Sequence, residues 1–549
     1  MEEVPDEIEG TEPERRWSFR TVLRCMLAGL GMFAESYFIF TTGQMHGIWR
    51  AAYPECWATD ESDPVCLSNS DCPQIFGDGG PEVADSAECL LVRCNERTKL
   101  ILSGSEFIGI MVGMLVFAYF SDVVGRRVGS VVVSFFMLVG SAVMTFTPFS
   151  GGSKSGIFTV FTIGFAILGF GIGGEYPLSS VSATERAEEF LSASKRGSYV
   201  VTVFTMQGLG ALVGSSVLLV SVRLARVKVL DCSKSKANAL GYNAALLGRI
   251  WRSVYIVGFW FLLLVILYRL FFTDESAAFS RRGGTAKSSL FAKFRDLHRF
   301  YFARLFGTAF SWFLWDVCFY GNKLFISSII SSLRTSDSLV GEERYILINN
   351  LVSLAGYILA ILLVDRIGRR NMQAFGFTVL ALVFLLVTLF FNYLASNSTV
   401  IISLYLVTSF FGQLGPNATT YLLPAETFPT EVRSIAHGIS AFSGKGGALL
   451  GTMVFGLMST RFIFLTCGLV SLLGALTTGL FTADVKSLEL SELDKWHEEK
   501  QFGKGVTSSA ALPENLSIVE RLRGQATAAG PLYEPAQELS DDEADTPTY

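Results

Sequence analysis

The sequence predicts an all-α membrane protein with twelve transmembrane helices in two six-helix bundles. Half of the 549 residues are apolar, and they come in runs of about 20, each long enough to cross a bilayer. The motif SDVVGRR at 121–127 returns as VDRIGRR at 364–370, which indicates two related bundles. The predicted spans are 20–46, 99–120, 128–148, 156–182, 197–222, 250–272, 301–331, 345–364, 372–394, 399–424, 434–459 and 460–482.

The Lys and Arg residues predict which helix ends face the cytosol, because basic loops stay on that side. Four basic groups fall on one side of the predicted topology, at 15–24, 126–127, 281–304 and 366–370. The basic loop 223–236 falls on the other side and is the exception. We therefore expect a multi-pass protein of the plasma membrane with both termini in the cytosol.

These boundaries divide the chain into five regions. They are a cytosolic N-terminal tail (1–19), an N-terminal bundle (20–272) with a cysteine-rich external loop (47–98), a cytosolic linker (273–300), a C-terminal bundle (301–484) and an acidic cytosolic tail (485–549). The acidic tail is expected to be mostly disordered. A solvating role is favoured for it, and binding of a cytosolic adaptor is the alternative.

The external loops carry six cysteines, at positions 56, 66, 72, 89, 94 and 232. External compartments permit disulfides, and six cysteines allow fifteen pairings. Up to three bridges are therefore predicted, with free thiols as the alternative. The Asn397-Ser398-Thr399 sequon in a short loop is a candidate glycosylation site.

The repeated turns each combine an acid, a glycine and paired arginines, and we expect them to act in gating. We expect each acid to cap the following helix and the arginines to bind a facing helix end or a lipid phosphate. Plain anchoring by positive charge is the alternative, but it does not explain the repeated acid and glycine. The predicted gating residues are Asp122, Arg126, Arg127, Asp365, Arg369 and Arg370.

Ionisable residues are few inside the predicted spans: Glu35, Glu106, Glu175, Asp316 and Lys445. A charge in hydrocarbon is costly unless it is paired, protonated or hydrated. Acids in such surroundings are suited to carrying protons, as a proton-coupled carrier requires. Structural hydrogen bonding between helices is the alternative.

Hydrogen-bond donors accompany these acids. Trp312, Asp316 and Tyr320 recur every four residues and share one helix face. Their indole, carboxyl and phenol groups place donors around an acid, which suits an oxyanion. Gln207 and Asn417 add neutral donors. A polar span of this kind must face protein or a water-filled cavity, so the pattern favours a transporter.

Longer motifs resemble the phosphate:proton symporters of the major facilitator superfamily. Span 4 reads GGEYPLS (173–179), and span 7 carries Trp-x3-Asp-x3-Tyr. GPNATT (415–420) and P-x-E-x-FPT (424–430) follow in span 10, and span 11 reads AHGISA-x-SGK (436–445). The resemblance covers the twelve spans but neither the tails nor the cysteine-rich loop.

The resemblance implies proton-coupled import of inorganic phosphate by alternating access, with no cofactor. It implies that phosphate is ringed by Tyr176, Gln207, Trp312, Asp316, Tyr320 and Asn417. Glu175 and Asp316 would exchange protons, Glu35 would lie on a proton route, and Lys445 would be a nearby cation.

The chain departs from the family pattern at three positions. Span 4 has Glu175 where the phosphate:proton symporters have Asp, and the related glycerophosphodiester permeases also have Glu there. Phe38 replaces a second acid of span 1, and Phe165 replaces an arginine of span 4. An organic phosphate such as a glycerophosphodiester is therefore an alternative substrate, and a non-transporting nutrient sensor is a third interpretation.

An enzyme or a nucleic-acid binder is not expected, since nucleotide-binding and metal-ligand motifs are missing and the net charge is −5.

Overall fold

The computed structural model describes residues 19–52, 96–147, 154–191, 193–225, 244–275, 289–324, 339–395, 397–455, 457–486, 488–502, 508 and 515–522. In this part of the chain every regular element is a helix. The first half contains α1 (Phe19–Ala28), α2 (Leu30–Ala52), α4 (Glu96–Val124), α5 (Arg126–Thr145), α6 (Lys154–Phe190), the short η2 (Ala193–Lys195), α7 (Arg196–Leu224) and α8 (Ala244–Phe272).

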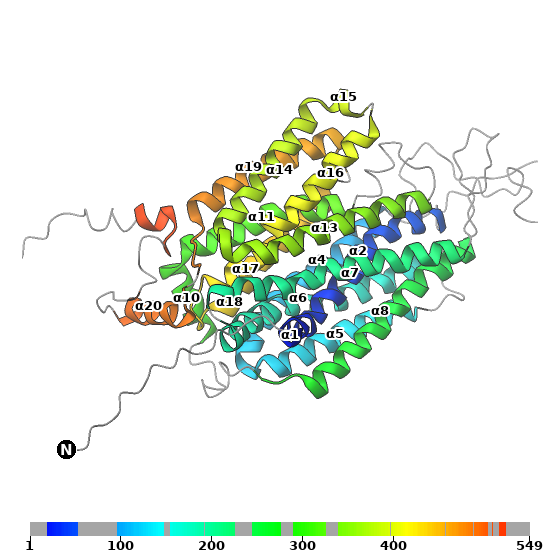
Figure 1. The fold of residues 1–549 in the computed structure, drawn as a ribbon. Helices are drawn as coiled ribbons and strands as arrows, with labels where there is room; N and C mark the ends of the chain where they lie inside the picture. The colour runs from blue at the N-terminus through cyan, green and yellow to red at the C-terminus, as the bar shows by residue number, and fades with distance from the viewer. Residues whose placement is uncertain are drawn as a thin grey trace, which may run out of the picture.

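The second half begins with a short helix, and Figure 1 shows its helices together with those of the first half. It contains α10 (Leu290–Phe300), α11 (Phe302–Leu324), α13 (Leu339–Ile367), α14 (Arg369–Leu389), α15 (Phe391–Ala395), α16 (Ser398–Gly412), η3 (Gln413–Asn417), α17 (Ala418–Glu426), α18 (Arg433–Phe455), α19 (Thr460–Phe481) and α20 (Leu490–Phe502).

Twelve rods of helix cross the molecule, as the sequence predicts. Nine described helices are long and apolar enough to cross a membrane, and α1 with α2 makes a tenth span bent by 47°. The remaining two rods are α11 and α18. Both carry charged residues within the span, among them Asp316 on α11 and Lys445 on α18. Their polarity is a first sign that they line a site rather than face lipid.

The glycines of span 4 let α6 pack closely on α4. A Cβ added to Gly173 would lie 2.1 Å from the carbonyl oxygen of Ile110, and one added to Gly113 would lie 2.1 Å from that of Phe170. Only glycine permits such an approach of two backbones. α6 continues through Pro177 to Phe190 and is therefore longer than the predicted span.

Span 10 is broken into three pieces. α16 passes into the five-residue π-helix η3, which contains Pro416, and then into α17. Proline lacks an N–H and clashes with the preceding turn, and π-turns often mark functional positions within helices. The break lies at the GPN motif and ends on Asn417.

Part of the acidic tail packs on the bundle. Residues 485–486, 488–502, 508 and 515–522 of the tail are described, and the expectation of disorder for the rest lies outside the described residues. α20 lies beside α10 at one end of the molecule, at left in Figure 1. Trp496 packs against Tyr301 with ring centroids 5.8 Å apart, and the Asp494 carboxylate accepts hydrogen bonds from the Thr430 N–H and hydroxyl at 2.6 and 2.7 Å. Apolar burial explains why this segment folds against the bundle.

A second tail segment, residues 515–522, is held by a buried arginine. Arg304 Nε lies 2.6 Å from Glu520 Oε1, and its other nitrogens donate to the carbonyl oxygens of Thr427 and Asn515. Burial alone would raise the pKa of Glu520, but the Arg304 guanidinium and hydrogen bonds from Ser517 hold it below its usual value. Glu520 is therefore ionised at neutral pH.

Candidate functional site

The deep polar residues meet at the interface between the two bundles. Lys445 of α18 donates from Nζ to Asp316 Oδ2 at 3.1 Å and to the Tyr320 hydroxyl at 2.7 Å. Asp316 and Tyr320 both lie on α11, four residues apart. All three are buried, so one acid and one cation compensate each other inside the membrane region.

The first bundle joins this group through two phenols. The Tyr176 hydroxyl lies 3.3 Å from that of Tyr320 and donates to the Glu35 carboxylate. Lys445 Nζ lies 4.0 Å from the ring centroid of Tyr320 and 4.7 Å from that of Tyr176, which adds cation–π attraction. The acids of span 1 and span 7 are thus connected through tyrosines.

Amides complete the network on the other side of Glu35. Gln207 Nε2 lies 3.4 Å from both Glu35 Oε2 and the Tyr176 hydroxyl. Gln207 Oε1 accepts from the Tyr357 hydroxyl at 2.7 Å and from Asn417 Nδ2 at 3.2 Å. We call this set the central cluster: Glu35, Tyr176, Gln207, Asp316, Tyr320, Tyr357, Asn417 and Lys445.

Three residues around Asn417 were missed by sequence reasoning. Asn417 Nδ2 donates to Tyr357 and to Gln413 Oε1, both at 2.5 Å, and Trp315 Nε1 donates to Asn417 Oδ1 at 2.7 Å. Gln413 precedes Asn417 by one helical turn, and that spacing was an available signal. Tyr357 stands alone in an apolar run, so only the tertiary fold reveals its role.

Trp312 borders the central cluster through its ring. Its centroid lies 6.0 Å from that of Tyr176 and 5.5 Å from that of His437. The six residues predicted to surround phosphate therefore lie close together, and the Trp312 ring lies at the edge of the group.

Glu175 is directed away from the other predicted residues. Both of its carboxylate oxygens accept hydrogen bonds from Arg269 of α8, at 2.6 and 2.9 Å. Arg269 also donates to the Ser134 hydroxyl and the Ser130 carbonyl oxygen. The sequence did not identify Arg269 as the partner of Glu175.

The first repeated turn links the bundles at one end of the molecule, which we call the turn end. Asp122 is bonded to Arg126 at 2.9 Å, to Lys293 at 2.7 Å and to the Ser434 hydroxyl of α18 at 2.6 Å. Arg126 also lies 3.2 Å from Glu185 of α6. One acid therefore joins the first bundle to the linker and to the second bundle.

The second repeated turn mirrors the first. Arg369 is bonded to Asp365 at 2.9 Å and to Glu426 at 2.6 Å, and Glu426 also accepts from Arg196 of α7 at 2.8 Å. Asp365 further accepts hydrogen bonds from the N–H and the hydroxyl of Ser198. Arg196, Arg369 and Glu426 are fully buried, so this link also crosses between the bundles.

The predicted helix caps are not formed by the turn acids. Neither Gly125 nor Gly368, which precede the new helices, has a side-chain cap. The N–H groups of Arg126 and Arg127 instead donate to the Glu275 carboxylate at 2.8 and 3.1 Å. The turn acids are occupied by arginines and by the opposite bundle, which is why they do not turn back to cap.

The second arginine of each turn binds a facing helix end, as expected. Arg127 donates to the carbonyl oxygen of Leu270, and Arg370 donates to that of Gly479 at 2.5 Å. The equivalent roles in the two halves confirm that the repeat reflects two related bundles.

The cysteine prediction lies largely outside the described residues, including all six external cysteines. Cys25, Cys318 and Cys467 are buried with free thiols, and Cys318 Sγ donates to the carbonyl oxygen of Cys467 at 3.7 Å. These three cysteines are part of the buried core of the helices.

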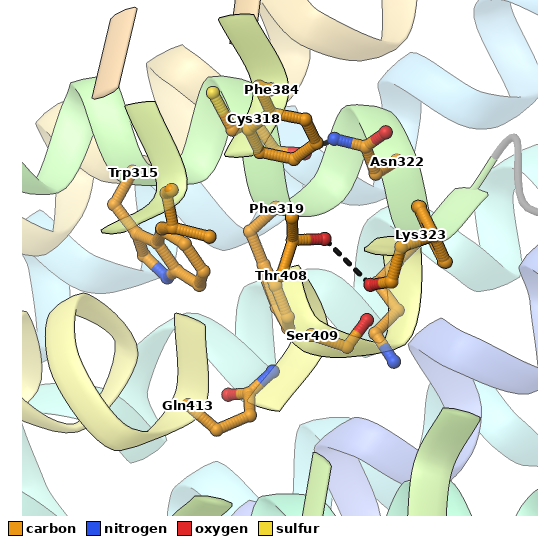
Figure 2. Close-up of a pocket in the computed structure, with 11 residues that line it drawn as sticks. Trp315, Cys318, Phe319, Asn322, Lys323, Phe384, Thr408, Ser409 and Gln413 are labelled. Carbon is orange, nitrogen blue, oxygen red and sulfur yellow. Dashed lines mark hydrogen bonds between the residues drawn. The ribbon is translucent and has the colours of Figure 1, made fainter. Parts of the chain in front are cut away.

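A small pocket of about 30 Å³ adjoins the central cluster on its amide side. Side chains of α11, α14, α16 and η3 line it, and Figure 2 draws the 11 lining residues and labels nine of them. Trp315 and Gln413, which both bond Asn417, form its boundary with the cluster.

Comparisons with known proteins agree with this architecture. The family model described as "Sugar (and other) transporter" matches residues 25–292 and 316–496. The chain is 26% identical over 463 residues to inorganic phosphate transporter 1-11 of Oryza sativa subsp. japonica, covering 77% of each chain. It is 27% identical over 419 residues to glycerophosphoinositol transporter 1 of Saccharomyces cerevisiae, covering 75% of this chain and 76% of the relative.

The fold also matches that of a solved transporter. The proton:xylose symporter XylE superposes with a TM-score of 0.64 at 17% identity, over 87% of this chain and 99% of the other. The matched proteins are transporters rather than enzymes, and the resemblance read from the motifs is confirmed. The chain belongs to the sugar (and other) transporter family, and its fold is that of a major facilitator superfamily transporter.

Proposed function

We propose that the protein imports inorganic phosphate together with protons by alternating access. One observation carries this proposal: the central cluster joins acids, phenols, amides and a lysine into one hydrogen-bonded network across the two bundles. Ammonium, phenol and amide groups are the donors that an oxyanion requires. The phosphate transporters among the relatives support the choice of substrate.

Coupling follows from competition for Lys445. Without substrate, Lys445 compensates Asp316 at 3.1 Å. An arriving phosphate, which is itself anionic, takes up the donors of Lys445 and Tyr320. Asp316 is then a buried carboxylate beside an anion, and this repulsion is strong where water is excluded. A proton on Asp316, or one shared with phosphate, relieves the repulsion, so the ion and the proton bind together.

The other two acids have different positions in this scheme. Glu35 lies two hydrogen bonds from Tyr320 through Tyr176, which suits a place on the proton route. Glu175 is paired with Arg269, and it exchanges a proton only in a conformation that opens this pair. Proton movement through Glu175 therefore requires motion of α6 against α8.

Alternating access uses the links at the turn end as one gate. We place the protein in the plasma membrane. The turn end and both termini then face the cytosol, because the basic residues gather at that end. Release of phosphate inward then requires the bonds of Asp122 to Ser434 and of Glu426 to Arg196 to break. The two bundles rock about the central cluster as they do so.

Replacing the acid that pairs with Lys445 tests the proposal. Asp316→Asn keeps the shape of the side chain and removes the titrating group. In sealed vesicles with radiolabelled phosphate, we expect wild-type protein to accumulate phosphate under an inward proton gradient, and the variant to lose this accumulation. Full uptake by the variant with an unchanged pH dependence would refute the role of Asp316.

Glu106→Gln is the matched control. It also removes a buried carboxyl from a transmembrane helix, but Glu106 has no hydrogen bond to the central cluster among the described residues. Proton-driven accumulation should persist in this variant. Its loss would show that any buried acid, rather than Asp316, determines coupling.

A phosphate ester is the second candidate substrate. The yeast relative named as a glycerophosphoinositol transporter and the glutamate at position 175 favour it. Glycerophosphodiesters should then compete with labelled phosphate and be accumulated themselves. Uptake of phosphate that is unaffected by a large excess of these esters would exclude them.

A further inference from the structure

Lys323 is a second lysine of the membrane region, and unlike Lys445 it is paired with neutral groups. It lies on α11 two helical turns, or about 10 Å, beyond Asp316 on the side away from the turn end. Its Nζ donates to Asn350 Oδ1 at 3.0 Å and to the Ser353 hydroxyl at 3.4 Å. Among the described residues it forms no ion pair with a carboxylate.

Lys323 stands at the outer end of a polar track that starts at the central cluster. On α13, Asn350 lies seven residues before Tyr357, and on α7, Ser215 lies eight residues after Gln207. Such spacings put each pair on one helix face. The track is continuous at its outer end, because Asn350 Nδ2 donates to the Ser215 hydroxyl at 2.7 Å.

The bond between Asn350 of α13 and Ser215 of α7 also joins the two bundles, and α2 of the first bundle adds to it. Gln44 of α2 donates to the Ser215 hydroxyl at 2.6 Å, while Gln44 Oε1 is buried and has no hydrogen-bond partner. Thr41 Oγ1 on the same helix is likewise buried without one. Unsatisfied polar atoms indicate a place that water or a polar ligand occupies when the bundles separate.

The pocket lies between Lys323 and the central cluster. Figure 2 shows Lys323, Ser409 and Gln413 around it, with the amide nitrogen of Gln413 directed toward the pocket. Asn322 also lines it, with a buried Oδ1 that lacks a hydrogen-bond partner. Lys323, Gln413 and Ser409 thus line one hollow that borders Asn417 through Gln413.

Membrane anchoring is the ordinary role of a lysine near a helix end, since its chain can extend to the lipid headgroups. Lys323 instead reaches across to α13. Its contacts are to the polar track rather than to the surface, and this geometry suits capture of an anion.

We propose that Lys323, with Gln413 and Ser409, forms an outer anion site that captures a phosphate group, free or esterified, before it reaches the central cluster. This inference rests on the proposed function. The lysine attracts the anion by charge, and the amide and hydroxyl bind its oxygens.

Kinetics of phosphate uptake test the site. Lys323→Gln removes the charge, and we expect the apparent KM for phosphate to rise about tenfold, the usual effect of losing one charge-assisted hydrogen bond. The maximal rate should stay close to wild type, because the central cluster is intact. Lys323→Arg should keep a KM near the wild-type value.

Arg461→Gln is the matched control, since it removes one exposed positive charge near the same end without touching the pocket. Its KM should not change. An unchanged KM in Lys323→Gln would overturn the outer site, and an equal rise in Arg461→Gln would assign the effect to the general field instead. The melting temperature of each variant shows whether it is folded.

The same assay separates this inference from the proposed function. Wild-type protein that moves no phosphate would refute phosphate transport itself, whereas wild-type transport with a normal KM in Lys323→Gln would refute only the outer site. Competition by a glycerophosphodiester, measured in wild type and Lys323→Gln, distinguishes the free ion from the ester. A weaker competitor in the variant would show that the ester is captured there too.

Discussion

At the scale of single residues, the environment of each acid decides what it can do. Asp316, Glu35 and Glu175 look alike in sequence, as lone acids in apolar runs. In the structure Asp316 is bonded to Lys445, and Glu35 is bonded to neutral donors. Glu175 is bonded to the two terminal nitrogens, Nη1 and Nη2, of an arginine. A lysine is a single flexible point charge that a substrate can compete for, whereas a two-bonded arginine is harder to displace.

The pair of Glu175 and Arg269 leads to a stability prediction. Glu175→Gln leaves Arg269 buried and without a carboxylate, so the free energy of unfolding should fall by about 3 kcal/mol. Thermal unfolding of the purified variant measures this as a lower melting temperature. Glu175→Gln combined with Arg269→Gln should recover part of the loss, because no buried charge is then left unpaired.

The double variant also examines proton transfer by Glu175. It is expected to fold and to show a changed pH dependence of phosphate accumulation. If Glu175→Gln alone were as stable as wild type, the ion pair would not matter for stability. If the double variant kept the wild-type pH dependence of accumulation, Glu175 would not be on the proton route.

At the scale of elements, two devices bring side chains to the site. The π-turn η3 ends on Asn417 and places Gln413 beside it. The repeated turns depend on glycines with positive φ, 97° at Gly125 and 93° at Gly368. A side chain at such a φ is strained, so these glycines allow the chain to reverse and start the next helix directly at the paired arginines.

Gly368→Ala should therefore destabilise the protein by about 1–3 kcal/mol, the cost of an alanine in this backbone region. The added Cβ would also lie 2.5 Å from Asp484 Oδ2. Gly479→Ala is the control, because Gly479 lies in the last turn of α19, where an added Cβ would have no neighbouring atom within 4 Å. Thermal unfolding should show a loss for the first variant only, and equal melting temperatures would contradict the role of the turn.

At the scale of the whole molecule, the two bundles are joined differently at their two ends. Buried ion pairs join them at the turn end, through Glu426 with Arg196 and Arg369. Amides and hydroxyls join them beyond the central cluster, through Gln44, Ser215 and Asn350. Ion pairs between buried groups are costly to separate, so substrate binding must supply energy for opening the turn end.

Glu426→Gln should shift the protein toward opening at the turn end, because it removes the charge that joins Arg196 to Arg369. A cysteine placed at Thr202, which is buried on α7 near this link, should then react faster with a membrane-impermeant thiol reagent applied from that side. The rate in the Thr202→Cys background alone is the reference.

Glu175→Gln in the same background is the matched control, since it breaks a buried ion pair within one bundle. Its labelling rate should stay at the reference value. An unchanged rate in Glu426→Gln would show that this ion pair does not hold the turn end closed, and faster labelling in both variants would indicate general loosening.

The sequence by itself determined the twelve spans, the two related halves and most of the central cluster. Hydrocarbon imposes long apolar runs, and it makes each retained polar group conspicuous in the sequence. The motif spacing on α11 and the GPN motif therefore revealed Asp316, Tyr320 and Asn417 directly.

Only the tertiary structure decided which charges are partners. Arg269 lies 94 residues from Glu175 and Lys445 lies 129 residues from Asp316, and no local pattern records such distances. The contacts of Tyr357, of the tail helix α20 and of Lys323 are likewise made with residues far away in the sequence, and only the tertiary structure reveals them. Pairing across helices depends on how the helices rotate and pack, and a linear pattern specifies only the face that each helix presents.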